Sequence, residues 1–117
     1  MSHDNKGREI IDYLNDIDDS ISDILNFTAD ISYEEFEADK KTQHAVIHCL
    51  EVIGEAVKKI PDDIRNRYNK IPWKEIAGMR DKLIHEYFGV DLKTVWATIV
   101  EDIPPLEDLI CQIIEDL

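Results

Sequence analysis

Apolar residues recur at helical spacing along almost the whole chain, and this periodicity constrains the fold more than any other feature. The first stretch, from about Gly7 to Ala29, has an apolar stripe close to the 3.6-residue period of an α-helix, and its opposite face is rich in aspartate. The stripe consists of Ile10, Ile11, Leu14, Ile17, Ile21, Ile24, Leu25 and Ala29. This pattern predicts a long amphipathic helix.

Start and stop signals divide the next part of the chain into further helices. Ser32 followed by Glu35 predicts a capping box at the start of a short turn. A second long helix is expected from Asp39 to Ile60, where Pro61 ends it, followed by a helical turn over 62–68. The expected core face of the long helix is Ala45, Cys49, Val52, Ile53, Ala56 and Ile60.

The second half of the chain contains similar helix start and stop signals. Pro72 suits the first position of a third helix, which runs to Phe88 and is followed by Gly89. Asp91 is expected to cap a fourth helix, and Pro104-Pro105 to break or kink it before a last amphipathic segment. Together these signals predict an all-α fold, an up-and-down bundle of four to five helices with short connections.

Length and composition limit the number of domains and the class of protein. At 117 residues the chain is expected to form one helical domain over 1–117, with residues 1–7 as a polar tail. No stretch approaches the roughly 18 apolar residues of a membrane span, so a cytoplasmic protein is expected. Cys49 and Cys111 both lie in apolar helical patterns, which predicts buried free thiols and no disulfide.

The formal net charge of −13 argues against a general nucleic-acid-binding protein, which normally presents a basic face. The basic residues are uneven, however, and the acidic excess is concentrated near the two ends of the chain. A concentration of basic residues between positions 58 and 82 contains Lys58, Lys59, Arg65, Arg67, Lys70, Lys74, Arg80 and Lys82. A local basic cleft is therefore compatible with the composition.

Arg80 stands where the third helix should carry an apolar residue. It falls near the middle of the stripe formed by Trp73, Ile76, Ala77, Leu83, Ile84 and Phe88. Tyr87 lies on the same face. A guanidinium keeps its charge in proteins and is costly to bury unpaired. Arg80 therefore needs an acidic partner, a ligand or a solvated cleft.

Arg80, His85 and Tyr87 allow two interpretations. One is structural: a buried salt bridge, a histidine at a helix end and an aromatic core residue. The other is metal-independent cleavage of RNA, in which His85 moves a proton and Arg80 stabilises charge on the phosphate. The two residues lie about 140° apart on an ideal helix. A long arginine side chain or a helix break near His85 would have to bring them together.

An arginine followed by His-x-Tyr resembles the signature of the HEPN superfamily of helical ribonucleases, and the flanking sequence is similar to its HepT-like toxin subgroup. The matching blocks are HCLEVIGEA at 48–56, IPWKEIAGMRD at 71–81, HEYFGVD at 85–91, Trp96 and DIPPL at 102–106. The resemblance covers nearly the whole chain from Arg8 onward, and the three motif positions are intact.

The resemblance implies a two-fold homodimer with the motif at an interface cleft. It also implies an endoribonuclease toxin of a type VII-like toxin–antitoxin pair, in which Arg80 and His85 are catalytic and Tyr87 binds or orients the RNA substrate. The implied antitoxin is a minimal nucleotidyltransferase that adenylylates Tyr87 and so silences the toxin. No cofactor is implied.

Two residues next to the motif are further candidates. Asp81, four positions before His85, could orient the imidazole or raise its pKa, or it could form a plain helical contact. Lys82 could bind an RNA phosphate or remain solvated. Trp73 and Trp96 are expected to be core residues.

A polar set on the second helix is the remaining candidate, consisting of His44, His48, Glu51 and Glu55. Their spacing places them on one face, where they could bind a metal ion. A solvated face or a dimer face is favoured, because no matching set of ligands appears on another helix, and no metal site is predicted. Glu55 could line the cleft and pair with Arg80.

A non-catalytic function is the alternative to the ribonuclease. The chain could be a helical binding partner of a nucleotidyltransferase, recruiting a nucleotide or a target through the same cleft. The net charge of −13 favours this alternative, because it weakens RNA affinity. The intact pair of Arg80 and His85 favours the enzyme.

Overall fold

The structure is a computed structural model that describes residues 9–78 and 91–117. Within these ranges it contains helices and no strand. The elements are α2 (Ile10–Phe27), α3 (Tyr33–Glu37), α4 (Lys40–Val57), α5 (Asp62–Arg67), a helical turn at 73–78, α7 (Leu92–Ala97), the π-helix η2 (Thr98–Asp102) and α8 (Ile103–Asp116). The predicted all-α bundle is confirmed.

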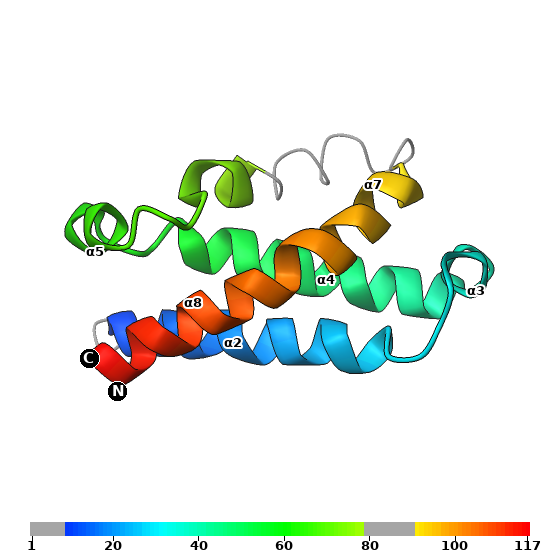
Figure 1. Cartoon of the computed structure of the whole chain (residues 1–117), viewed down its shortest axis with the longest axis horizontal. Coiled ribbons are helices and arrows are strands. Elements are labelled where there is room, and N and C mark those ends of the chain that lie inside the picture. Colours follow the sequence, from blue (N-terminus) through cyan, green and yellow to red (C-terminus); the bar gives the residue numbers. More distant parts are fainter. Residues whose placement is uncertain (1–8, 79–90) are drawn as a thin grey trace, which may run out of the picture.

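Helices α2 and α4 lie side by side and antiparallel, and the carboxyl-terminal helix α8 crosses them (Figure 1). Their facing stripes form one hydrophobic core. Its fully buried side chains include Leu14, Ile17, Ile21 and Ile24 of α2, Val46 and Val57 of α4, and Ile110 and Ile113 of α8. Burying one such side chain contributes about 1.5–3 kcal/mol, so these three stripes supply most of the driving force for folding.

Short element α3 closes the bundle at the amino end of α4. The predicted capping box is present: the Ser32 hydroxyl accepts from the Glu35 backbone N–H at 3.1 Å, and the Glu35 carboxylate accepts from the Ser32 N–H at 3.0 Å. The buried Phe36 ring packs against Trp96 of α7, with ring centroids 5.2 Å apart. The contact between Phe36 and Trp96 therefore links α7 to α3, at the start of α4.

Element α5 closes the opposite end of the bundle. Helix α4 ends at Val57, before the predicted end at Ile60, and Pro61 is the N-cap residue of α5. The Arg65 side chain reaches back to the carbonyl of Val57, the last residue of α4. The Tyr68 hydroxyl donates to Asp116 near the end of α8 at 2.6 Å, and the Trp73 indole N–H donates to the Tyr68 carbonyl at 3.1 Å. These contacts join α5, α8 and the helical turn at 73–78.

Pro104-Pro105 was expected to break or kink the fourth helix, and the α-helical hydrogen bonding is interrupted just before the two prolines, where η2 separates α7 from α8. Helical backbone continues from α7 through η2 into α8, with the two prolines in the first turn of α8. Pro104 cannot donate to the carbonyl four residues earlier, and its ring would clash there. The preceding turn widens instead, and the Ile103 N–H donates to the Thr98 carbonyl five residues back.

Two further details differ from the sequence-based predictions. Cys111 is an exposed free thiol, whereas Cys49 is buried as expected. Cys111 lies on the edge of α8, and its sulfur is 3.6 Å from an oxygen of Asp18 on α2. The buried face of α4 is also wider than the single stripe that was predicted, because α4 contacts both α2 and α3. Its additional buried residues are Val46, Ile47, Leu50 and Val57.

Candidate functional site

Most of the predicted motif lies outside the described residues. Arg80, Asp81, Lys82, His85 and Tyr87 all fall between positions 79 and 90. The described structure shows the two segments that flank them, the groove beside those segments and the charge around them.

The segment before the motif is firmly anchored. Ile71, Trp73 and Ile76 are buried, whereas Lys74 and Glu75 point to solvent. The turn at 73–78 thus begins with the apolar face that the sequence predicts, and Trp73 is a core residue as expected. Its indole hydrogen bond to the Tyr68 carbonyl fixes the direction in which the chain enters the motif.

The segment after the motif begins with the predicted cap. The Asp91 carboxylate accepts from the Lys93 backbone N–H and from the Thr94 hydroxyl, both at 3.0 Å. The hydrogen bond from the Thr94 side chain, followed by that from the Lys93 backbone, lowers the pKa of Asp91 below its usual value. An ionised cap at this position also suits the amino end of a helix.

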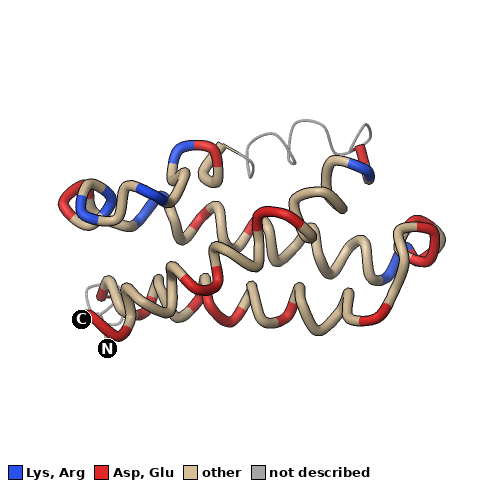
Figure 2. Tube along the Cα trace, in the orientation of Figure 1, with Lys and Arg blue, Asp and Glu red and all other residues tan. Residues whose placement is uncertain are grey.

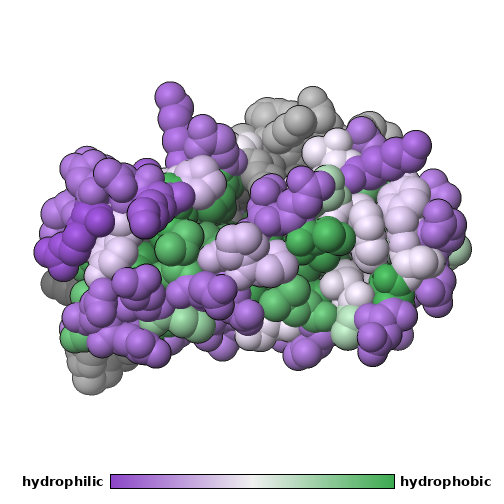
Figure 3. Space-filling model, in the orientation of Figure 1, coloured by the Kyte–Doolittle hydropathy of each residue, from purple (hydrophilic) through white to green (hydrophobic). Residues whose placement is uncertain are grey.

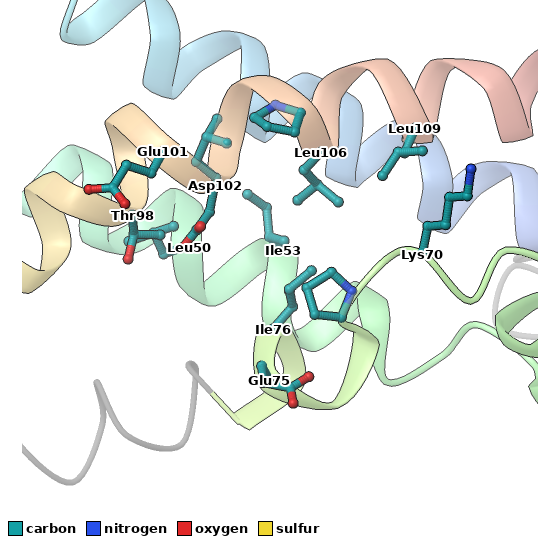
Figure 4. A pocket seen from close by; sticks show the side chains of 13 residues that line it. Leu50, Ile53, Lys70, Glu75, Ile76, Thr98, Glu101, Asp102, Leu106 and Leu109 are labelled. Carbon is teal, nitrogen blue, oxygen red and sulfur yellow. The ribbon is translucent and has the colours of Figure 1, made fainter.

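An apolar groove opens between the turn at 73–78, α4, η2 and α8 (Figure 4). It encloses about 380 Å³ and has Leu50, Ile53, Ile76, Leu106 and Leu109 among its walls. Its polar lining comes from Lys70, Glu75, Thr98, Glu101 and Asp102. The space-filling view shows hydrophobic surface on this face of the molecule, flanked by hydrophilic side chains (Figure 3).

Sequence reasoning did not find this groove. Its walls come from four separate segments, so no local spacing could indicate that they meet. The sequence signals that bear on it are the prolines: Pro72 and Pro105 both line the groove, one at each wall. One wall belongs to the turn that leads directly to the Arg80 motif.

Glu55 lies elsewhere. It is exposed on α4 and lines a shallower pocket of about 190 Å³ between α2 and α4, together with Tyr13, Asp16 and Lys59. Among the described residues, Glu55 is not part of the groove beside the turn at 73–78. Its predicted pairing with Arg80 depends on a residue outside the described ranges.

The polar face of α4 has the predicted exposure. His44, His48 and Glu55 are exposed, and Glu51 is half-buried. Over residues 9–78 and 91–117, no group of three or more histidine, cysteine or acidic side chains is placed to hold a metal ion. In the same ranges, no helix is both long and apolar enough to cross a bilayer.

The charges are segregated in space as well as in sequence. Basic side chains gather around α5 and the turn at 73–78, whereas acidic side chains dominate α2, α3 and α8 (Figure 2). The basic side chains of this region are Lys58, Lys59, Arg65, Arg67, Lys70 and Lys74. A local concentration of basic side chains, which the composition allowed, is therefore present in the described part of the chain, next to the segment that enters the motif.

Comparison with known proteins gives a consistent result. The family model described as "Ribonuclease HepT-like" matches residues 17–113. The Methanocaldococcus jannaschii protein named "Putative RNase MJ0125" is 58% identical over 110 residues, covering 94% of this chain and 95% of that protein. A second protein of the same organism, "Putative RNase MJ1216", is 56% identical over 110 residues, covering 94% and 91%.

The Thermococcus cleftensis protein named "Probable ribonuclease HepT" is 56% identical over 96 residues, covering 82% of this chain and 87% of that protein. No solved structure gives a significant match. The family match spans the helices on both sides of the motif as well as the motif itself. The chain belongs to the HepT-like family of the HEPN superfamily.

Proposed function

We propose that this protein is an endoribonuclease that cuts RNA with the Arg80 and His85 pair. The observation that carries the proposal is the family match over residues 17–113, which includes an intact arginine, histidine and tyrosine motif. Trp73 before the motif and Val95 after it support the proposal, because both are buried in the core and so attach the two segments that flank the motif to the bundle.

The proposed chemistry is attack by the RNA 2′-oxygen on the adjacent phosphorus. The bond from phosphorus to the next 5′-oxygen breaks, and this oxygen keeps the electron pair and takes a proton from water, which leaves a 5′-hydroxyl on one fragment and a 2′,3′-cyclic phosphate on the other. His85 accepts the proton of the 2′-hydroxyl, because imidazole titrates near neutral pH. Arg80 stabilises the extra negative charge on the phosphate oxygens through a planar, permanently charged donor. The step uses no redox change.

The direct test is cleavage of a labelled RNA by the purified chain. His85→Ala and Arg80→Ala should each lower the cleavage rate by at least about 100-fold, the usual contribution of general acid–base or charge-stabilising groups. His44→Ala is the matched control, because it removes an exposed histidine of α4 outside the motif. Equal residual activity in the His85→Ala and His44→Ala proteins would exclude His85 as the acid–base group.

The regulatory part of the proposal concerns Tyr87 and a partner. We place the protein in a toxin–antitoxin pair, as a homodimer silenced by a minimal nucleotidyltransferase that adds an adenylyl group to Tyr87. The added phosphate would lie near the Arg80 guanidinium on an ideal helix, because the two residues are seven positions apart. Mass spectrometry of the chain co-expressed with the transferase should show the added mass on Tyr87 and none on Tyr87→Phe.

The alternative function is a non-catalytic binding subunit for the same transferase. The net charge of −13 is the observation that favours it. The two functions differ in one result: a binding subunit leaves RNA intact and still forms the complex, whereas the proposed enzyme cuts RNA when purified alone.

A further inference from the structure

We propose that the exposed lysines around α5 and the turn at 73–78 bind the phosphate backbone of the RNA substrate, outside the catalytic motif. We call Lys59, Lys70 and Lys74 the basic end. The inference rests on the proposed ribonuclease function. It assigns to the basic end a role in binding RNA and no role in the chemical step.

The first support is the contrast in charge. Between positions 58 and 75 the chain has six basic and three acidic side chains, although the whole protein carries a net charge of −13. An RNA backbone is repelled by the acidic surfaces of α2, α3 and α8 and attracted to this end (Figure 2). The electrostatic field of the protein therefore favours approach of the RNA to the basic end.

The second support is that the cations of this region divide into two groups. Arg65 is committed to the fold, because its Nε donates to the Ile60 carbonyl at 2.9 Å and its Nη2 donates to the Val57 carbonyl at 2.7 Å. The three lysines of the basic end are exposed. A lysine ammonium on a flexible stem suits a phosphate as a mobile point charge.

The third support is position. Lys74 lies on the turn at 73–78, six residues before Arg80 in the sequence, and Lys70 lines the groove beside that turn (Figure 4). Phosphates bound by these two lysines are thus held beside the chain segment that enters the motif. Because the lysines contact only phosphate, the binding is independent of base sequence.

The test measures RNA binding and cleavage in two charge-matched variants. One is Lys70→Gln with Lys74→Gln, at the basic end. The other is Lys40→Gln with Lys41→Gln, two exposed lysines at the amino end of α4, at the opposite end of the bundle. Both variants lose the same charge, so a difference between them reports location. Thermal unfolding of both variants checks that the fold is intact.

Binding is measured with a fluorescently labelled oligouridylate and proteins that also carry His85→Ala, so that the RNA stays uncut. The basic-end variant should bind roughly tenfold more weakly at low salt, and its plot of log affinity against log salt should be shallower by about 0.7 per lost phosphate contact. In proteins with His85 intact, KM should rise by a similar factor while kcat stays unchanged. The Lys40/Lys41 variant should match the parent protein.

Three results would overturn the inference: unchanged binding in the basic-end variant, equal weakening in both variants, or normal RNA binding with loss of the complex with the nucleotidyltransferase. The last would mean that the basic end binds an acidic protein surface. Failure of the ribonuclease proposal looks different, because the parent protein would then leave RNA intact whatever the lysines do.

Discussion

At its amino end, helix α4 is capped by Asp39, whose carboxylate accepts from the Thr42 backbone N–H at 3.1 Å. At its carboxyl end, the Arg65 guanidinium donates to the carbonyls of Val57 and Ile60 at 2.7 and 2.9 Å. Both ends are thus closed by side chains from outside the helix. The charges are opposite, and each sign matches the partial charge that the helix presents there.

The two ends differ in what surrounds the closing side chain. Around Asp39, the neighbouring α3 and Gln43 complete a buried hydrogen-bonded corner. Around Arg65 the neighbouring cations are exposed lysines. The amino end also carries exposed lysines, Lys40 and Lys41, but its closing side chain is an anion, whereas at the carboxyl end the closing side chain and the exposed side chains next to it are both cationic.

The largest expected effect on stability is that of Arg65→Met, which keeps the apolar stem and removes the donors. Two carbonyls near the end of α4 lose a charged partner, and the free energy of unfolding should fall by about 1.5–3 kcal/mol. Urea denaturation measures it. Lys74→Met is the control, because Lys74 is exposed, and it should change the free energy of unfolding by less than about 0.5 kcal/mol. Equal effects of the two variants would break the division between structural and available cations.

A smaller loss is expected at the amino end from Gln43→Met. The buried Gln43 amide donates at 2.8 Å to the carbonyls of Phe36 and Glu37, and methionine has a similar shape without the donors. The free energy of unfolding should fall by about 1–2 kcal/mol. His44→Met, at the exposed neighbouring position, should have little effect. A Gln43→Met protein as stable as the parent would mean that the corner contributes little.

The smallest expected effect is a pH dependence of stability at the two aspartate caps. Hydrogen bonds from Thr42 lower the pKa of Asp39, and those from Thr94 and the Lys93 backbone lower the pKa of Asp91. A carboxyl whose pKa is lower in the folded state stabilises the fold above its unfolded pKa of about 3.9 and loses that contribution as pH falls through the folded value. The melting temperature of Asp39→Asn should therefore fall less steeply than that of the parent below about pH 4. Parallel curves would contradict this.

Much of this fold can be predicted from local patterns. The apolar stripe of α2, the capping box at Ser32 and Glu35 and the cap at Asp91 all depend on residues within a few positions of one another. Each was correctly predicted because periodicity and capping are local physical effects.

The features that sequence reasoning missed depend on distant contacts. Nothing near Arg65 in the sequence shows that it reaches back to Val57, and nothing near Tyr68 indicates its hydrogen bond to Asp116. The exposure of Cys111 is also a tertiary outcome, because it depends on how α8 packs against α2. In the candidate site, the motif was found by resemblance, and the groove beside it required the assembled bundle.

The most direct test of the central claim, that this chain cuts RNA with an arginine and histidine pair, is the cleavage of a defined RNA in excess chelator, with analysis of the new ends. The proposed mechanism predicts undiminished cleavage and a 2′,3′-cyclic phosphate or its hydrolysis product, both lost in His85→Ala. Cleavage that stops with chelator and returns with magnesium or manganese would contradict it.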